Sequence, residues 1–418
     1  MNVTASSEHA MSRDVKSSNP WGTLASIYEI PGAKRMPPME GLRGFAVLLV
    51  FFVHLDALFG PETKGISLLH AVSAFLGLIG NSGVDLFFVL SGYLIYGVLI
   101  RHRVSINQFI MRRIRRIYPT FFAVFVFYLL LSYVFSDSSR LRGYDASALA
   151  VYIAQNLLLL PGILSIPPII TVAWSLSYEL FFYLTIGLLF ATTKTRRWPK
   201  AVRVGLIVLV AACSLAASYA VPHSYVRAVM FLVGMLLAES LSSARFVQFL
   251  TARGEILAIA VFVAGLVYCY LLDVRPAFFS SLPGWWSGRS VIPGVISYQG
   301  PYKTLVLSIT GFWLCAFALA YDGLLRRAFS WTPLRYLGNI SYSYYLIHGV
   351  SLQGFALLSR TFVPQISGVA LYAFALTCGF ATTVVSATVL FLTVEKPTAF
   401  KNSQAMTEDL SKKRKINA

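Results

Sequence analysis

The chain has 418 residues, of which 57% are hydrophobic and 12% are charged, and its mean hydropathy is +0.68. So few charged side chains cannot cover the surface of a water-soluble globule, and so many apolar ones exclude a disordered chain. The net charge of +18 comes without a nucleic-acid-binding signature, so we attribute it to membrane topology and anionic lipid headgroups rather than to nucleic acid.

The two ends of the chain are polar. Residues 1–36 contain no apolar stretch that could serve as the core of a signal peptide, and we expect them to form a flexible cytoplasmic tail. Residues 398–418 include the basic run 412–415 and are expected to form a second, basic cytoplasmic tail. Residues 37–397 lie between these tails and are expected to form one transmembrane domain.

Ten apolar stretches approach the roughly 17–25 residues that a membrane helix needs. They lie at residues 42–60, 82–100, 117–135, 174–192, 203–221, 226–241, 255–272, 303–321, 337–358 and 368–394. Another stretch, 146–164, is interrupted by Gln155, Asn156 and Pro161, so we interpret it as a re-entrant or outer-interface helix. The sequence therefore predicts an all-α fold, a polytopic transmembrane helix bundle with about ten spans. Both termini then face the cytoplasm, because this orientation places most Lys and Arg inside.

The first apolar stretch contains two ionisable residues, Arg43 and His54, with ten residues between them. At about 100° per residue, eleven steps return nearly to the same helix face, and a rise of ~1.5 Å per residue separates the two groups by roughly 16 Å. Arg43 therefore lies near one interface if His54 lies near the middle of the membrane. An ionisable residue at that depth predicts a functional site.

Asp85 begins the second span, within the segment 83–93. Gly83, Ser91 and Gly92 in this segment allow close helix packing, which explains them without a function. A carboxylate at the start of a span needs either water or a cationic partner. Both a structural and a functional role for Asp85 are open on the sequence alone.

Four of the five positions from 112 to 116 are arginine, directly before the third span. Such a cluster can act as a topology anchor. It contains no lysine, however, and planar guanidinium groups suit bidentate contacts to phosphate. This preference for arginine favours an anion-binding site over simple anchoring.

Two later spans carry polar stripes. They consist of Ser175, Glu179 and Tyr183 in one span, and of Ser341, either Tyr344 or Tyr345, and His348 in the other. A carboxylate flanked by hydroxyl groups suits the orientation of a base or a sugar, whereas hydrogen bonding between helices explains either stripe without a substrate. Glu395 ends the last span, where a role in helix termination is at least as well supported as a catalytic one.

In order and spacing, these elements resemble the acyltransferase-3 family of integral-membrane O-acyltransferases. The matching elements are Arg43 with His54 and the segments 83–93, 112–119, 174–183 and 341–348. The resemblance implies an acyl-coenzyme A donor such as acetyl-CoA, no tightly bound cofactor, and commonly a sugar hydroxyl as acceptor. It further implies a multi-pass enzyme of the bacterial cytoplasmic (inner) membrane, and we expect the stand-alone type without an esterase-like domain.

On this resemblance we expect His54 to act as general base toward the acceptor hydroxyl, or to carry the acyl group transiently. Asp85 or Glu179 would stabilise the cation that forms, and Arg43 would share the catalytic site. The residues expected to bind the coenzyme are Arg43, Arg112, Arg113, Arg116 and Tyr118. Those expected to bind the acceptor are Ser175, Tyr183, Ser341, Tyr345 and His348.

The expected acceptor is a cell-surface polysaccharide, a lipid-linked saccharide or a related glycoside. A different class of protein, a transporter or flippase of a polysaccharide intermediate, would use the polar stripes as a path, although no inverted repeat supports it. A catalytically idle membrane partner is a third interpretation. The four cysteines lie apart in apolar stretches without metal-ligand spacing, so we expect neither a metal site nor a redox site.

Overall fold

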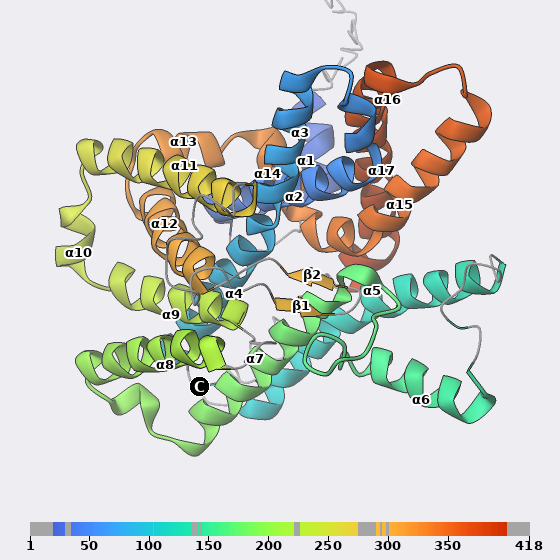
Figure 1. Cartoon of the computed structure of the whole chain (residues 1–418). Helices are drawn as coiled ribbons and strands as arrows, with labels where there is room; N and C mark the ends of the chain where they lie inside the picture. Colours follow the sequence, from blue (N-terminus) through green and yellow to red (C-terminus); the bar gives the residue numbers. More distant parts are fainter. Residues whose placement is uncertain are drawn as a thin grey trace, which may run out of the picture.

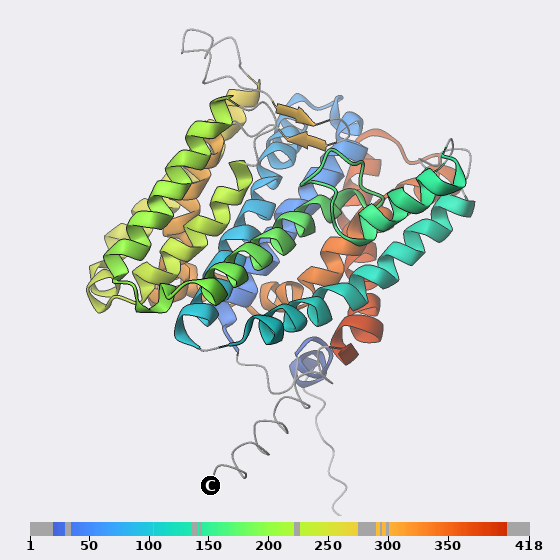
Figure 2. The same cartoon turned by 90° about the horizontal axis from the view of Figure 1, so that it is seen from below.

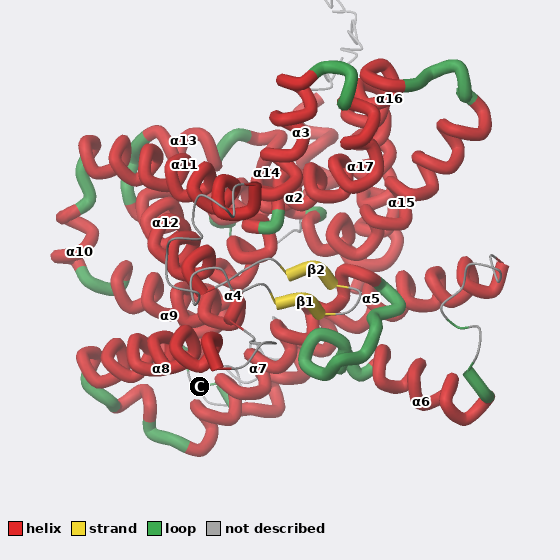
Figure 3. The backbone as a smooth tube through the Cα atoms, in the orientation of Figure 1, coloured by secondary structure: helices red, strands yellow, loops and turns green. Residues whose placement is uncertain are grey.

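A computed structural model describes residues 20–29, 35–102, 104–134, 141, 144–220, 226–274, 290–292, 295–297 and 301–398. Nearly all of this backbone is helical (Figure 1, Figure 3). Two short strands, β1 (Ser290–Ile292) and β2 (Val295–Ser297), pair antiparallel. The predicted all-α bundle is thereby confirmed as the architecture of the protein.

Seventeen α-helices follow one another along the described chain. They are α1 (Pro20–Tyr28), α2 (Pro37–Phe59), α3 (Ser67–Gly80), α4 (Ser82–Arg101), α5 (Ile106–Val134), α6 (Ala146–Leu157), α7 (Trp174–Thr192), α8 (Lys200–Ala220), α9 (Val229–Leu241), α10 (Ala244–Phe249), α11 (Ala252–Val274), α12 (Pro301–Ala320), α13 (Leu324–Phe329), α14 (Thr332–Asn339), α15 (Ser341–Phe362), α16 (Gly368–Phe374) and α17 (Phe380–Leu390). A π-helical turn, Ala375–Gly379, joins α16 to α17, and a second, Phe391–Glu395, extends α17.

Within the described residues, eight helical segments are long and apolar enough to cross a membrane. They are Pro37–Thr63, Ser67–Arg101, Ile106–Val134, Thr171–Thr192, Lys200–Ala217, Ala252–Leu271, Tyr302–Ala320 and Gly368–Thr398. The other two predicted spans correspond to α9, which has 13 residues, and to α15, which has 22 residues but carries several polar side chains. The total of ten spans and the side on which the termini lie stay predictions.

The helix α6 covers the first part, residues 146–157, of the stretch 146–164 that we interpreted as re-entrant or interfacial. It has 12 residues, which at 1.5 Å per residue is too short to cross a hydrocarbon layer of ~30 Å. Its N-terminus is capped by Asp145, whose carboxylate accepts a hydrogen bond from the backbone N–H of Ala148 at 2.8 Å. The length of α6 therefore favours the original interpretation of this stretch.

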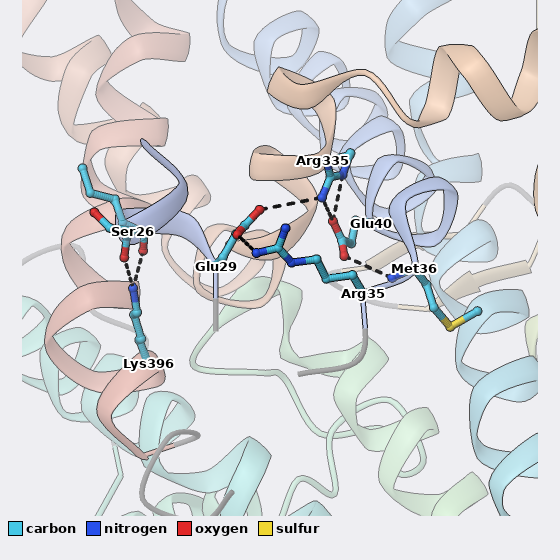
Figure 4. A network of polar contacts seen from close by, with 8 residues as sticks. Ser26, Glu29, Arg35, Met36, Glu40, Arg335 and Lys396 are labelled. Carbon is cyan, nitrogen blue, oxygen red and sulfur yellow. Dashed lines mark hydrogen bonds and ion pairs between the residues drawn. The ribbon is translucent and has the colours of Figure 1, made fainter. Parts of the chain in front are cut away.

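The helix α1 lies within the segment that we expected to be a flexible tail, and it is docked on the bundle (Figure 4). Lys396 donates a hydrogen bond to the backbone carbonyl of Ser26 at 2.5 Å. Arg335 on α14 forms an ion pair with Glu40 at 2.9 Å and lies 3.8 Å from Glu29, which directly follows α1. Ser26 and Glu29 thus contact residues that are about 300 or more positions away along the chain. Local sequence patterns therefore did not reveal this docking.

The long helices run roughly parallel to one another, with α4 among the central ones (Figure 2). The helix α4 packs against α2, α7, α9 and α12, and α15 packs against α2, α5, α14 and α17. Helices from the first and last thirds of the chain are thereby placed side by side. Polar residues that are far apart in the sequence can meet at these contacts.

The helices α2 and α14 approach each other at backbone distance. A Cβ atom added to Gly44 would lie 1.9 Å from the carbonyl oxygen of Leu334, and one added to Gly338 would lie 1.7 Å from that of Glu40. Only glycine permits so close an approach. This contact fixes the start of α2, which carries Arg43, against the segment that leads into α15.

Replacing Gly338 by alanine is expected to destabilise the bundle, because the new Cβ would overlap a backbone oxygen that cannot rotate away. Overpacking typically costs about 1–3 kcal/mol, so we expect a lower Tm in detergent, measured by fluorescence-detected size exclusion after heating. Gly205→Ala on α8 is the matched control, since an added Cβ there has no neighbour within 4 Å. Equal Tm values for the two variants would contradict the close contact.

Candidate active site

A cavity lies between α2, α4, α5, α7 and α15, and its empty volume, counted with the open solvent at its mouth, is about 880 Å³. Its charged and hydroxyl-bearing lining residues are Arg43, Ser91, Arg113, Arg116, Ser175, Glu179, Tyr183, Ser341, Tyr342 and Tyr345. Apolar side chains from α4, α5 and α7 form most of the remaining wall. The cavity is therefore an apolar pocket with polar groups concentrated on a few helix faces, as is usual for a small-molecule site.

Three arginines from two helices meet at this cavity. Arg43 comes from α2, whereas Arg113 and Arg116 come from the first turns of α5. None of the three forms an ion pair with a described carboxylate. The guanidinium group of Arg113 lies 5.6 Å from the ring centre of Tyr183, and its Nε atom is buried with no hydrogen-bond partner in the described part of the chain. Donor groups of the protein are thus left free at the cavity wall.

Two carboxylates partly balance these cations. Glu179 accepts hydrogen bonds from the Ser91 hydroxyl, at 2.5 Å, and from the Tyr183 hydroxyl. Glu395 accepts hydrogen bonds from the Ser343 hydroxyl, at 2.5 Å, and from the Ser343 backbone N–H, at 3.1 Å. Both carboxylates lie close enough to Arg43 to interact with it electrostatically. With three arginines and two carboxylates, this region has one positive charge in excess, which suits a bound anion.

The two predicted histidines, His54 on α2 and His348 on α15, face each other. Their ring centroids are 4.7 Å apart and the rings meet edge to face at 65°. They do not line the cavity described above, but Tyr345, which does, contacts the His348 ring at a centroid distance of 5.9 Å. The Tyr345 hydroxyl is held by Ser175, which donates to it at 2.7 Å. The histidine pair therefore lies directly behind a residue of the cavity wall.

Asp85 is placed away from the histidines. Its carboxylate forms a buried ion pair with Arg227, at 2.9 Å from Nε, and the two side chains are 4% and 7% exposed. Arg227 also donates to the backbone carbonyl of Asn81 and lies over the ring of Trp174 at 5.1 Å. The cationic partner that a carboxylate at this depth requires is therefore Arg227, and Asp85 is engaged in joining α4 to the turn before α9.

Eight of the sequence-predicted site residues line the cavity, namely Arg43, Arg113, Arg116, Ser175, Glu179, Tyr183, Ser341 and Tyr345. His54 and His348 adjoin it as a pair. Asp85, Arg112 and Tyr118 do not line it, and Arg112 is exposed. The catalytic and binding roles given to all of these residues stay predictions.

Two polar lining residues, Ser91 and Tyr342, were not predicted as site residues from the sequence. Ser91 lies in the segment 83–93, where its small size suggested packing alone, yet its hydroxyl binds Glu179. Tyr342 donates from its hydroxyl to the backbone carbonyl of Ile117 at 2.7 Å. Ser91 follows Phe87 by one helical turn on the cavity side of α4, so a search for polar groups on that face would have found it.

Comparison with known proteins identifies one family. Residues 38–392 match the family model described as an acyltransferase domain. The acyltransferase MdmB of Streptomyces mycarofaciens is 32% identical over 164 residues, which are 38% of this chain and 40% of that protein. The peptidoglycan O-acetyltransferase OatA of Listeria monocytogenes is 27% identical over 343 residues, 75% of this chain and 49% of that protein. The exopolysaccharide production protein ExoZ of Rhizobium meliloti is 27% identical over 276 residues, 65% of this chain and 76% of that protein.

The coverage of these relatives is uneven. The chain spans less than half of the length of MdmB and of OatA, at 40% and 49%. No solved structure gives a significant match.

Removing one partner of the Asp85–Arg227 pair is expected to be strongly destabilising, because the other charge would stay buried and unpaired. Such losses are typically about 3–5 kcal/mol, so Arg227→Gln should lower the Tm in detergent markedly. Neutralising both partners, Asp85→Asn with Arg227→Gln, should recover part of that loss. Arg245→Gln on the exposed helix α10 is the control. A double variant that is less stable than Arg227→Gln alone would contradict the pairing.

Proposed function

The chain belongs to the acyltransferase-3 family, and we propose that it transfers an acyl group, acetyl in the simplest case, from acyl-coenzyme A to a saccharide hydroxyl. The observation that carries this proposal is the cavity in which Arg43, Arg113 and Arg116 meet without an ion pair to any described carboxylate, next to the His54–His348 pair. We place the enzyme in the bacterial inner membrane as a multi-pass protein that uses the coenzyme as a substrate and holds no tightly bound cofactor.

The donor is assigned to the arginine-lined cavity because coenzyme A carries several phosphate groups. Guanidinium groups bind phosphate through paired N–H donors, and the three arginines at this cavity are not committed to carboxylates. The predicted topology places the first turns of α5 on the cytoplasmic side, where acyl-coenzyme A is made. The phosphates would bind at Arg43, Arg113 and Arg116, and the apolar wall would hold the thioester arm.

In the proposed reaction, the hydroxyl oxygen of the acceptor attacks the thioester carbonyl while His54 accepts the hydroxyl proton. The C–O bond of the ester forms, the C–S bond breaks, and the proton passes to the departing thiolate to give free coenzyme A. A transient acyl-histidine at His54 is the other route. Because Tyr345 lies between the cavity and the histidine pair, the thioester arm must pass this residue to reach His54.

A saccharide acceptor is supported by two relatives. One is named as a peptidoglycan O-acetyltransferase and another as an exopolysaccharide production protein. We therefore propose a polysaccharide, a lipid-linked saccharide or a related glycoside as the acceptor class for this chain. The hydroxyl-bearing residues Ser175, Tyr183, Ser341 and Tyr345 are the proposed contacts, because all four line the cavity.

The experiment that tests this function incubates purified protein in detergent micelles with radiolabelled acetyl-CoA and membrane glycolipid extract. We expect wild type to transfer label to carbohydrate, and His54→Ala to lose transfer while keeping its Tm. Equal transfer by both proteins would remove His54 from the chemistry. A transporter, by contrast, would consume no thioester in micelles and would need a sealed membrane to act.

Replacing Arg113 or Arg116 by glutamine is expected to raise the KM for acetyl-CoA by roughly tenfold or more, because a hydrogen bond to a charged group contributes about 1.5–3 kcal/mol. The matched control is Arg115→Gln, since Arg115 belongs to the same arginine cluster but does not line the cavity. Initial rates over a range of acetyl-CoA concentrations give the comparison. Equal KM values for all three variants would contradict a donor site at these arginines.

A further inference from the structure

The most unusual polar group near the site is one nitrogen of His348. His348 is 1% exposed, and its Nε2 atom is buried without a hydrogen-bond partner among the described residues. A buried polar atom is normally paired, so an unpaired one requires an explanation. The imidazole of His54 is its neighbour, at a ring-centroid distance of 4.7 Å, and its N–H group is a hydrogen-bond donor suited to this nitrogen.

The other nitrogen of His348 fixes the state of its ring. Nδ1 lies 2.8 Å from the backbone carbonyl oxygen of Tyr345 and 3.1 Å from that of Tyr344. Carbonyl oxygens only accept hydrogen bonds, so Nδ1 must carry the proton. In the neutral ring, Nε2 then holds the free lone pair. His348 is thus set as a hydrogen-bond acceptor on the side away from its own backbone.

The aromatic surroundings hold this ring in place. Tyr344 stacks on His348 with an angle of 6° between the planes and a centroid distance of 5.4 Å, and the Tyr344 hydroxyl is hydrogen bonded to Thr383 at 3.1 Å. Tyr345 contacts the same ring from the cavity side. The His348 ring is therefore confined, whereas His54 is only partly buried and forms no hydrogen bond with a described residue. Of the two histidines, His54 is the one whose ring nitrogens are not held by a described group.

We propose that His348 is a positioning residue for His54, which it orients by accepting at Nε2 a hydrogen bond from the single ring N–H of neutral His54. The centroid distance is short enough for a ring nitrogen of His54 to reach Nε2 after rotation about its own side-chain bonds. This hydrogen bond would fix the tautomer of His54 and leave its other nitrogen with a lone pair for the acceptor hydroxyl. The inference rests on the proposed function of His54 as general base.

The proton balance of the reaction is unchanged by this arrangement. As the hydroxyl oxygen bonds to the thioester carbon, its proton moves to the free nitrogen of His54, and the other N–H of His54 donates more strongly to His348. When the C–S bond breaks, the proton on His54 passes to the thiolate sulfur. The two backbone carbonyls that accept from His348 Nδ1–H help to disperse the positive charge of the pair.

Two replacements of His348 separate positioning from packing. His348→Gln keeps amide N–H groups for the backbone carbonyls and an oxygen that can accept from His54, whereas His348→Phe keeps the ring shape but has no nitrogen. We expect His348→Phe to lower kcat about tenfold or more with little change in the KM for acetyl-CoA. His348→Gln should retain a clearly larger share of kcat than His348→Phe.

The controls use the other histidines of the chain. His70→Gln tests histidine loss outside the site, since His70 Nδ1 is hydrogen bonded to the Thr63 hydroxyl at 2.9 Å; its kcat should match wild type. In a His54→Ala background, adding His348→Phe should not lower the residual rate further, because a positioning residue acts through His54. Size-exclusion profiles and Tm values of every variant show whether it is folded.

Several results would overturn the inference. One is a wild-type kcat in His348→Phe while His54→Ala is inactive, which would leave the proposed function of His54 intact. A second is an equal loss of kcat in His348→Gln and His348→Phe. A third is a lower residual rate when His348→Phe is added to His54→Ala. If His348→Phe does not fold, the inference is tested with His348→Gln alone. A kcat of His348→Gln as low as that of His54→Ala would contradict the inference, because a hydrogen-bond acceptor at position 348 would then not be sufficient to position His54. Wild-type activity in His54→Ala would instead reject the proposed function itself.

Discussion

A guanidinium group in an apolar bundle must be compensated by charge or by hydrogen bonds, and much of this structure follows from how its arginines are compensated. Arg227 is paired with Asp85 at 2.9 Å, and Arg203 is paired with Glu239 at 2.6 Å. These pairs join α4 and α8 to the helix α9 or the turn before it. Arg43, Arg113 and Arg116 differ from these two, because they line a cavity and form no ion pair with a described carboxylate.

This difference divides the polar groups of the bundle into two kinds. Paired charges are satisfied within the protein and serve helix packing, whereas the unpaired arginines keep donors for an external anion. The glycine contact between α2 and α14 holds Arg43 in place, and the α15 stripe brings Tyr345 to the cavity and His348 to His54. One rigid set of helix contacts thus positions both the proposed donor site and the proposed base.

Sequence periodicity predicted much of this arrangement, because each helix face is a local property. The spacing of Arg43 and His54 placed them on one face of α2, and both indeed face the polar stripe of α15. Periodicity does not reveal which other helix a given helix face contacts. The partner of Asp85 is 142 positions away, and that of Ser26 is 370 positions away. The pairing of Asp85 and the docking of α1 therefore became visible only in three dimensions.

The measurement that tests the central claim most directly is a cryo-electron microscopy map of the protein bound to coenzyme A, with an antibody fragment to aid alignment. We expect density for the coenzyme phosphates beside Arg43, Arg113 and Arg116, with the thiol arm directed along the cavity toward Tyr345. A coenzyme bound elsewhere, with the three arginines unoccupied at saturating ligand, would contradict the assignment of this cavity as the donor site.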